Sequence, residues 1–315
     1  MGRIPMHVSR AKRACHPYRS MAIALALGVF STGAYAMQDT ADTTWDVWAV
    51  SNEESTQAIN HDPMTNILRA ISVEERGKES IAYVALTGRS LEYVNAYISF
   101  LERIPISRLN RNEQLAYWLN LHNVGIIRLL AENRNGHRQL KKYRGVSGMP
   151  GDQWSEKMFT VEGRALSLED IEQNILFRHW KDPLIIYGLC YGAKGSPSIG
   201  KVGFSGRTVK AQLEENARNF INSNKNVRVR KANLQVSSLY TWNQAALFDG
   251  NDEAVVAHLS AYAEPKLAQK LARVTGINKN KFNWSSNAFI PRAAPQVGFG
   301  FGGGGGGGSP VGAGS

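Results

Sequence analysis

Apolar residues recur at helical spacing along residues 111–133, which form the longest strongly patterned stretch of the chain. The side opposite this stripe is also largely apolar, so the pattern predicts a central helix that the rest of the domain surrounds. Four polar residues interrupt the pattern: Glu113, Asn120, His122 and Asn123. Because a buried polar group without a hydrogen bond costs on the order of 1–3 kcal/mol, they indicate either a polar network that fixes the fold or the floor of a site.

Shorter segments on both sides of this helix show the same periodicity. Ser90 is the expected N-cap of a helix over residues 90–103. Ser167 and Asp170 form a capping box that opens another helix. Further helices are predicted over residues 206–222, 254–262 and 265–274.

Alternation of apolar and polar positions predicts two hairpins, over residues 158–165 and 226–237. The run from Leu184 to Leu189 is continuously apolar and has the length of a strand, which favours a strand covered on both faces. The sequence contains no internal repeat. The mixture of predicted helices and hairpins therefore indicates an α+β, helix-rich single domain with a small sheet and a central buried helix.

Both ends of the chain differ in composition from the middle. Residues 1–36 join a basic leader, a short apolar run and a small-residue cleavage site, which is the anatomy of a secretory signal peptide. The apolar run is too short to span a bilayer, so we expect an exported protein, periplasmic or secreted, that keeps no transmembrane anchor after cleavage. Residues 37–60 are then a lead-in arm, residues 61–290 the folded domain, and residues 291–315 a disordered glycine-rich tail.

Charge and cysteine content narrow the choice of partners. Removal of five leader cations from the formal charge of +11 leaves a mildly basic mature chain. Its basic cluster is most simply a solvated loop, and the alternative is a surface for an anionic cell-envelope polymer; nucleic acid is not expected as a partner of an exported protein. Cys190 is the one cysteine outside the leader, so no intramolecular disulfide is expected. The cluster consists of Arg138, Lys141, Lys142 and Arg144.

The string NEQLAYWLNLHN in the central helix resembles the signature helix of the family called domain of unknown function 547. LSLEDIEQNIL (residues 166–176) is similar to the second motif of that family, and DPLIIYGLCYGAKGSP (residues 182–197) is similar to its third. Because the three motifs occur in order, the chain is identified as a member over residues 61–290. The resemblance implies a domain but no reaction, because no activity is established for the family.

The third motif is the natural place for a site. Its loop follows the predicted buried strand and contains two glycines, so backbone amides can point inward. Cys190 or Ser196 would act there as a nucleophile if a base lay nearby, with Glu113 in support. A free cysteine is nevertheless more often a small buried apolar residue than a nucleophile. The candidate ligand-binding residues are Asn120, Tyr191 and Lys194.

The resemblance also bears on catalysis. Members of the family often carry cysteines at the positions of Tyr191 and Ser196, and a histidine at the position of Gln173. Cys190 is displaced by one residue from the first of those cysteines, and such a shift turns a side chain to the other face of a strand. If those groups are catalytic in other members, the resemblance implies that this chain is a degenerate copy.

Helical geometry separates the polar residues of the central helix. At about 100° per residue, Glu113 and Asn120 share one face, and His122 lies near the centre of the opposite face. Glu113 and His122 are therefore not expected to form a direct acid–base pair, and His122 is expected to be a core residue with satisfied hydrogen bonds. Glu113 and Asn120 are expected to bond the backbone of the loop at residues 192–196, either as a structural brace or as part of a site.

These observations favour a binding or scaffold module over an enzyme. The alternative is a cysteine- or serine-dependent hydrolase or acyl-transfer enzyme that uses the loop after the buried strand. No metal or cofactor is expected, because the histidines lack metal-motif spacing and the glycines near Lys194 lack the spacing of a phosphate-binding loop.

Overall fold

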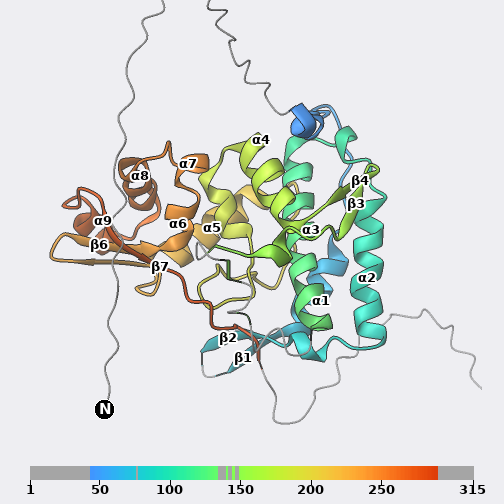
Figure 1. Cartoon of the computed structure of the whole chain (residues 1–315), viewed down its shortest axis with the longest axis horizontal. Helices are drawn as coiled ribbons and strands as arrows, with labels where there is room; N and C mark the ends of the chain where they lie inside the picture. The colour runs from blue at the N-terminus through green and yellow to red at the C-terminus, as the bar shows by residue number, and fades with distance from the viewer. Residues whose placement is uncertain (1–42, 76, 134–139, 141–143, 146–148, 290–315) are drawn as a thin grey trace, which may run out of the picture. The chain divides into compact units, whose positions relative to one another are not determined.

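The computed structural model describes residues 43–289, apart from residues 76, 134–139, 141–143 and 146–148 (Figure 1). The leader, the glycine-rich tail and three members of the basic cluster therefore lie outside the described residues. The described residues share one continuous hydrophobic core. The cluster members in question are Arg138, Lys141 and Lys142.

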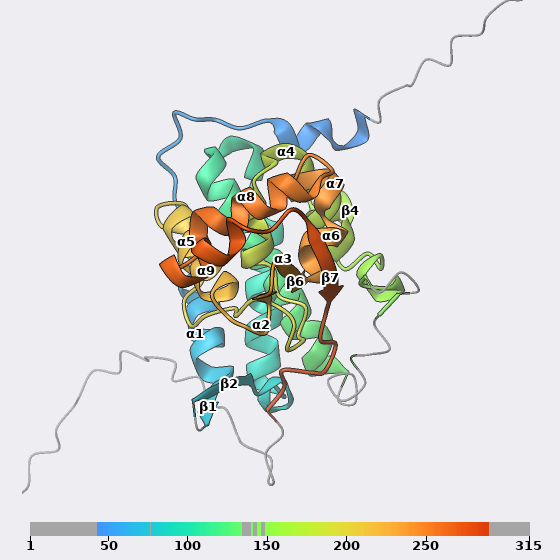
Figure 2. The ribbon, with the colours of Figure 1, turned by 90° about the vertical axis from the view of Figure 1, so that its left-hand side faces the viewer.

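The predicted central helix is α3 (Arg111–Glu132), and it is buried along most of its length. Asn110 caps its first turn through its side chain. Four other elements pack around it: α2 (Arg89–Glu102), η2 (Tyr83–Ala85), η6 (Asp170–Phe177) and α5 (Val209–Ile221) (Figures 1 and 2). Because α3 is surrounded, its polar side chains have to find partners within the protein. The prediction of a central buried helix is confirmed.

Helical segments make up the larger part of the described chain, which confirms the helix-rich α+β class. The longer helices besides α2, α3 and α5 are α1 (Asp62–Ile71), α8 (Asp252–Tyr262) and α9 (Pro265–Leu271). The short helices are α4 (Arg178–Trp180), α6 (Ser238–Trp242) and α7 (Gln244–Leu247). The 3-10 helices are η1 (Thr43–Ala49), η2 (Tyr83–Ala85), η3 (Ile106–Arg108), η5 (Asp152–Trp154) and η7 (Pro183–Gly188), whereas η6 is a π-helix.

Three separate small sheets occur in the described chain, where the sequence led us to expect one. Both predicted hairpins are present as antiparallel pairs, and a late strand adds to the second of them in parallel. The first sheet pairs β1 (Ser72–Glu75) with β2 (Lys78–Ile81), and the second pairs β3 (Phe159–Val161) with β4 (Arg164–Leu166). The third contains β5 (Val227–Arg230), β6 (Asn233–Ser237) and β7 (Ile277–Lys281).

The prediction of a buried strand from Leu184 to Leu189 is wrong. This segment is buried, but it forms the 3-10 turn η7, which the Asp182 side chain caps by accepting a hydrogen bond from the Leu184 amide at 2.9 Å. Side-chain amides take the place of a neighbouring strand: Asn216 donates to the Tyr187 carbonyl at 3.2 Å. A short apolar run fits a buried helical turn as well as a buried strand, so periodicity alone could not decide.

The start of α2 also differs from the prediction. Gly88, not Ser90, is the N-cap, and its φ of +51° is one that a residue with a side chain rarely adopts. The Ser90 hydroxyl lies in the first turn, where it accepts a hydrogen bond from the Thr87 amide at 2.9 Å and donates one to the Thr87 carbonyl at 2.8 Å. The hydroxyl thus still fixes the start of the helix, although it does so from inside the first turn.

The capping box before η6 is confirmed. The Ser167 amide donates to the Asp170 carboxylate at 2.8 Å, and the Asp170 amide donates to the Ser167 hydroxyl at 3.0 Å. The helix that follows has the wider turns of a π-helix, which is rare and is often found at functional sites. It carries Glu172, whose side chain is buried.

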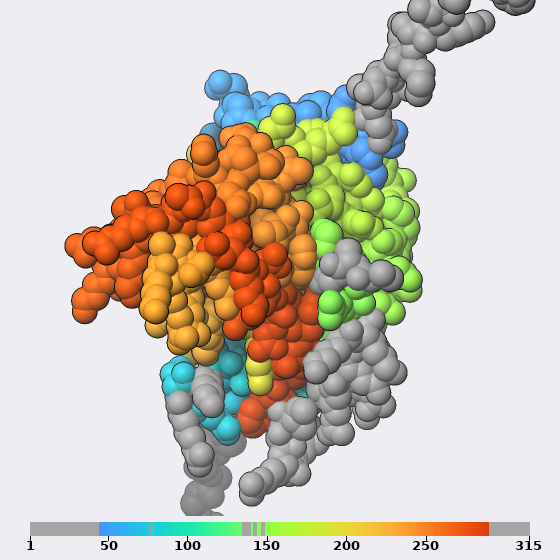
Figure 3. All heavy atoms as spheres, turned by 60° about the vertical axis from the view of Figure 1, so that its left-hand side comes forward, coloured from blue at the N-terminus to red at the C-terminus, as the bar shows by residue number. Residues whose placement is uncertain are grey.

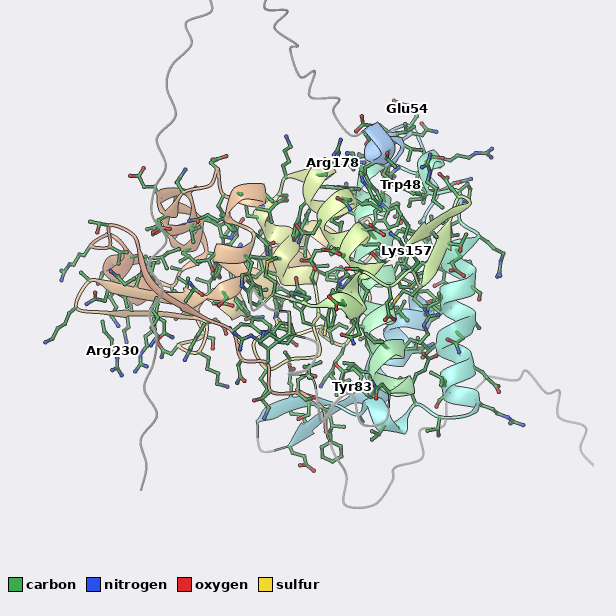
Figure 4. The ribbon with its side chains drawn as sticks, in the orientation of Figure 1. Trp48, Glu54, Tyr83, Lys157, Arg178 and Arg230 are labelled. Carbon is green, nitrogen blue, oxygen red and sulfur yellow. The ribbon has the colours of Figure 1, made fainter. Side chains whose placement is uncertain are left out.

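The arm before α1 is fixed to the domain from its first described residues. Trp48 on η1 is only 3% exposed and meets Trp118 of α3 edge-on, with ring centroids 5.1 Å apart (Figure 4). Arg178 pairs with Asp46 of the same turn at 3.0 Å. The start of the described chain therefore packs directly on the central helix.

Candidate functional site

One buried polar group from each of the three motifs meets at a single point. His122 comes from α3, Glu172 from η6, and Tyr191 from the segment after η7. His122 Nε2 lies 3.7 Å from Glu172 Oε2, and the rings of His122 and Tyr191 meet edge-on with centroids 6.3 Å apart. The Tyr191 hydroxyl lies near enough to the Glu172 carboxyl to lower its pKa. We call these three residues the buried triad.

Burial sets the protonation of the buried triad. It raises the pKa of the Glu172 carboxyl to about 7 and lowers the pKa of the His122 imidazole to about 4. Both shifts favour the uncharged forms, so the two groups do not form an ion pair at neutral pH. Among the described residues, neither His122 Nε2 nor Glu172 Oε2 has a hydrogen-bond partner.

His122 is therefore a core residue, as predicted, but its hydrogen bonds are not all satisfied. Its Nδ1 lies 3.3 Å from the Asn123 side-chain oxygen, whereas its Nε2 faces the Glu172 carboxyl beyond hydrogen-bonding distance. The prediction that Glu113 and His122 point apart is borne out by their different neighbours. The carboxyl that faces His122 comes from another helix, which the geometry of α3 alone could not reveal.

Asn123 joins α3 to the third motif. Its side-chain amide donates to the Gly188 carbonyl at 2.7 Å, and its side-chain oxygen accepts from the Cys190 amide at 2.9 Å. All three residues are buried. Asn123 therefore fixes the chain at the end of η7 and helps to set the positions of Cys190 and Tyr191, which follow Leu189.

The hydrogen-bond partners of Cys190 lie outside the buried triad. Its thiol is fully buried, accepts a hydrogen bond from the Gly192 amide at 3.3 Å, and lies against the Tyr83 hydroxyl (Figure 4 labels Tyr83). Burial raises the pKa of this thiol, which disfavours the thiolate that a nucleophile requires. The Tyr83 hydroxyl in turn donates to the Asn287 side chain at 3.1 Å. These contacts fit a structural cysteine better than a catalytic one.

The loop after Cys190 is held by the segment at residues 283–287. The Lys194 and Gly195 amides donate to backbone carbonyls of that segment at 2.8 and 3.0 Å. Gly192 has a φ of +67°, and a Cβ there would lie 2.3 Å from a Leu130 methyl group of α3. Glycine is thus required at Gly192 both by the backbone turn and by the close approach to the central helix.

Ser196 and Lys194 lie at the accessible side of this loop. The Ser196 hydroxyl accepts hydrogen bonds from the Tyr191 and Ala193 amides at 3.1 and 3.4 Å, and the residue is half-buried. Within the described ranges, no histidine or carboxylate is hydrogen-bonded to it. Lys194 is exposed. The hydroxyl therefore braces the turn but has no base to activate it.

The expected target of Glu113 and Asn120 is wrong. Asn120 bonds both backbone groups of Phe204, accepting from its amide at 3.0 Å and donating to its carbonyl at 2.8 Å. Glu113 accepts from the Ile59 amide at 3.3 Å and packs against Gly206, where a Cβ would lie 2.4 Å from a carboxylate oxygen. The two side chains share one face of α3, as predicted. Their partners, however, are the segment at residues 204–206 and the lead-in arm, not the loop at residues 192–196.

A hollow of 670 Å³, which we call the α5 cleft, opens beside the third-motif loop. It lies between β2, the segment at residues 194–204, and α5 with the residues that follow it. In Figure 3 the atoms of α5 (gold) stand above those of β2 (cyan) on this face. Two of the predicted candidates, Lys194 and Ser196, line the cleft. The other polar residues of its wall are Glu79, Ser198, Lys201, Gln212, Glu215, Asn216, Asn219, Ser223, Lys225 and Asn226.

Sequence reasoning missed Glu172 and the polar face of α5. Glu172 lies four residues after Leu168 and three before Ile175, so it falls on the apolar side of its helix, and that signal could have been found. On α5 and just after it, the polar residues Gln212, Asn216, Asn219 and Ser223 follow one another at steps of four, three and four. Such spacing places them on one face of a helix.

The positions at which the chain differs from the family wording lie together. Tyr191 belongs to the buried triad, and its amide donates to Ser196. Gln173 donates to the Glu172 carboxyl at 2.9 Å. The resemblance thus implies thiol and imidazole groups in other members where this chain places a buried phenol, a hydroxyl and an amide around Glu172.

The part of the chain that the structure describes was searched for metal-binding clusters and for membrane-spanning helices. No three His, Cys, Asp or Glu side chains come together there in a way that could hold a metal ion. No described helix combines the length and the apolar character that crossing a membrane requires.

Comparison with known proteins finds one matching family for a part of the chain. No curated protein and no solved structure matches the chain. Residues 106–221 match the family described as "Protein of unknown function, DUF547". The matched segment contains all three motifs and every member of the buried triad. This match agrees with the resemblance of the three motifs to the DUF547 family.

Proposed function

We propose that the protein is an exported binding module that takes an anionic ligand in the α5 cleft. The observation that carries this proposal is the state of two lysines in the wall of the cleft. Lys194 and Lys225 are exposed, and neither forms an ion pair with another described residue. An exposed cation beside hydrogen-bonding side chains attracts an anionic group and orients it.

The remaining wall supports recognition of a polar ligand. Lys201 is paired with Glu74 at 3.7 Å, and Ser198 donates to Glu79 at 2.9 Å, so these charges are already engaged. The amides on α5 supply both donors and acceptors. A cleft with two free cations and many neutral polar groups suits a ligand with spaced anionic groups better than a densely charged one.

Export is the part of the proposal that rests on the sequence. The basic leader, the apolar run and the small-residue site in residues 1–36 have the composition of a signal peptide. An exported protein meets anionic polymers of the cell envelope, which is the partner class that the sequence offered as the alternative for the basic cluster.

The alternative, a hydrolase or acyl-transfer enzyme, has less support. Its thiol candidate is buried with a raised pKa, and its hydroxyl candidate has no base hydrogen-bonded to it among the described residues. The histidine and carboxyl of the buried triad face a tyrosine, whose hydroxyl is a poor nucleophile when its pKa is raised by burial.

Binding to anionic polymers tests the proposed function. Purified protein is titrated with polygalacturonate, polyglutamate and polyphosphate at low and high salt. We expect at least one of them to bind with an affinity that falls as salt rises. Replacing both free lysines (Lys194→Gln with Lys225→Gln) is expected to weaken that binding about tenfold. The matched control replaces two exposed lysines of α9 (Lys266→Gln with Lys270→Gln). Absence of binding to all three polymers, or equal losses in both variants, contradicts the proposal.

Thiol labelling separates the module from the cysteine enzyme. In a Cys15→Ser background, Cys190 of the folded protein is expected to react with a thiol reagent at pH 7 at least about a hundredfold more slowly than in denaturant, because its thiol is buried and protonated. The rate is followed by the absorbance of the released thiolate or by mass spectrometry. Rapid stoichiometric labelling of the folded protein would favour the enzyme instead.

A further inference from the structure

A second hollow adjoins the α5 cleft. This hollow of 420 Å³ is lined by residues at the end of α5 and by the turn after α8. Asn219 and Ser223 belong to the walls of both hollows, so the two hollows adjoin each other along α5. From Gln212 to Asn222 the helix rises about 15 Å, at about 1.5 Å per residue. Together the two hollows form a groove that is longer than one small ring.

The second hollow has a different wall chemistry from the first. Tyr262 lies in its wall, half-buried, with the Arg218 guanidinium 5.5 Å from its ring centroid and the His258 ring packed against it at 5.2 Å. The ring is therefore held in place. Asn222 donates to the Tyr262 carbonyl at 3.0 Å and fixes the turn that presents it. An aromatic ring fixed beside polar groups provides an apolar surface with hydrogen bonds at its edge.

Asn219 stands where the two hollows meet. It is exposed, and its side chain makes no hydrogen bond to another described residue. Its donor and acceptor are therefore available to a ligand that passes from one hollow to the other. The order along the groove is thus free lysine, amide and tyrosine.

We propose that this groove binds a linear polysaccharide that carries carboxylates, with a carboxylate at Lys194 and a sugar ring against Tyr262. The inference rests on the proposed function and adds the ligand class. Sugar rings present apolar faces and hydroxyl-rich edges, which match a tyrosine ring and side-chain amides. Carboxylates at intervals along the chain match cations that are spaced and not crowded.

The charge of the groove separates this ligand from a nucleic acid. Glu79 and Glu215 line the first hollow, and Glu264 lines the second. Arg218 is paired with Glu214 at 3.1 Å. Binding of a phosphate backbone is driven by many lysine and arginine contacts, and three acidic residues along the groove oppose it. A carboxylated glycan has a lower charge density and is compatible with this mixture.

Oligomers of defined length test the inference. The full-length protein is titrated calorimetrically with galacturonic acid, with oligogalacturonates of two to eight units, with maltohexaose as the uncharged control, and with a twelve-residue oligothymidylate. We expect affinity to rise with oligogalacturonate length until both hollows are filled, and to be weak for the uncharged and nucleic-acid probes. Tyr262→Ala is expected to weaken binding of the longest oligomer about five- to tenfold and to leave the dimer unchanged. The control is Tyr93→Ala, a half-buried tyrosine on α2.

The outcomes distinguish this inference from the proposed function. If polyglutamate binds as tightly as polygalacturonate, or if length and Tyr262→Ala have no effect, the polysaccharide assignment is wrong and the anionic cleft stands. If the oligothymidylate binds as tightly as the longest oligogalacturonate, the ligand class is wrong. If no anionic probe binds, both the inference and the proposed function fail. An affinity that rises with oligogalacturonate length and falls in Tyr262→Ala but not in Tyr93→Ala supports both the inference and the proposed function.

Discussion

Replacing Asn123 by leucine is expected to lower the free energy of unfolding by about 3–5 kcal/mol. Leucine has the same number of side-chain heavy atoms, branched at the same carbon, so it occupies nearly the same shape beside α3. The change removes both hydrogen bonds to the backbone, together with the contact to His122 Nδ1, and leaves the Gly188 carbonyl and the Cys190 amide buried without partners. Each orphaned group costs on the order of 1–3 kcal/mol. Urea unfolding followed by tryptophan fluorescence measures the loss.

An exposed asparagine provides the control for this substitution. Asn66 lies on the solvent side of α1, and Asn66→Leu is expected to change stability by no more than about 0.5 kcal/mol. Asn120→Leu, which orphans both backbone groups of Phe204, is expected to resemble Asn123→Leu. A cost below about 1 kcal/mol for Asn123→Leu would show that the third motif does not depend on this brace.

The central helix was predictable because its signal is long and local. Helical periodicity over residues 111–133 requires only one element to be interpreted, and apolar residues on most sides of a helix have few explanations other than burial. The capping box at Ser167 and the two hairpins belong to the same kind of signal, since each depends on residues only a few positions apart.

The 3-10 conformation of η7 could not be predicted from such a local pattern. A run of six mostly apolar residues fits a buried strand and a buried 3-10 turn equally well. The choice between them depends on which groups form hydrogen bonds with the backbone of the run. Here Asn123 and Asn216, from two different helices, bond carbonyls of the turn. Those bonds exist only once α3 and α5 are in place, so they are a property of the assembled domain.

For the buried polar groups of α3, the sequence likewise predicted local geometry but not the partners. The sequence placed Glu113 and Asn120 on one face of α3 and His122 on another, because faces follow from helical geometry alone. It did not place the segments that meet those faces. Asn120 reaches Phe204, and His122 meets Glu172, both far away along the chain. Local periodicity thus predicted which way each group points but not what it contacts.

The surroundings of the buried triad are compatible with the binding role proposed for the domain. An imidazole, a carboxyl and a phenol lie together, but the thiol candidate faces Tyr83 and the hydroxyl candidate Ser196 braces a turn. The accessible charged and polar side chains lie instead in the α5 cleft, beside the loop that follows Cys190. The third motif therefore joins the core to the surface, through Asn123 on the inner side and Lys194 on the outer side.

Replacing Glu172 by glutamine is expected to make the stability difference between variant and wild type depend on pH. The wild-type carboxyl has an ordinary pKa near 4.5 when unfolded and a pKa of about 7 when folded, because burial disfavours its charge. Between those values the unfolded chain ionises first, so the wild type loses stability as pH rises. The loss amounts to roughly 3 kcal/mol by pH 8, since one pKa unit corresponds to about 1.4 kcal/mol. Glutamine cannot ionise and does not show it.

The expected result is therefore a gain for Glu172→Gln relative to the wild type that grows from pH 4.5 to pH 8. The buried histidines act in the opposite direction: burial lowers the pKa values of His61, His122 and His258 to about 4, so folding becomes more favourable as pH rises toward 6.5. The contributions of His61 and His258 are present in both proteins and cancel in the comparison, whereas that of His122, which faces Glu172 at 3.7 Å, is confined to pH values below about 6.5. Denaturant unfolding at half-unit pH steps measures the difference, with exposed Glu253→Gln as the control. A difference that stays constant with pH would mean that Glu172 is already ionised in the folded protein, and the pairing of uncharged groups at the buried triad would have to be abandoned.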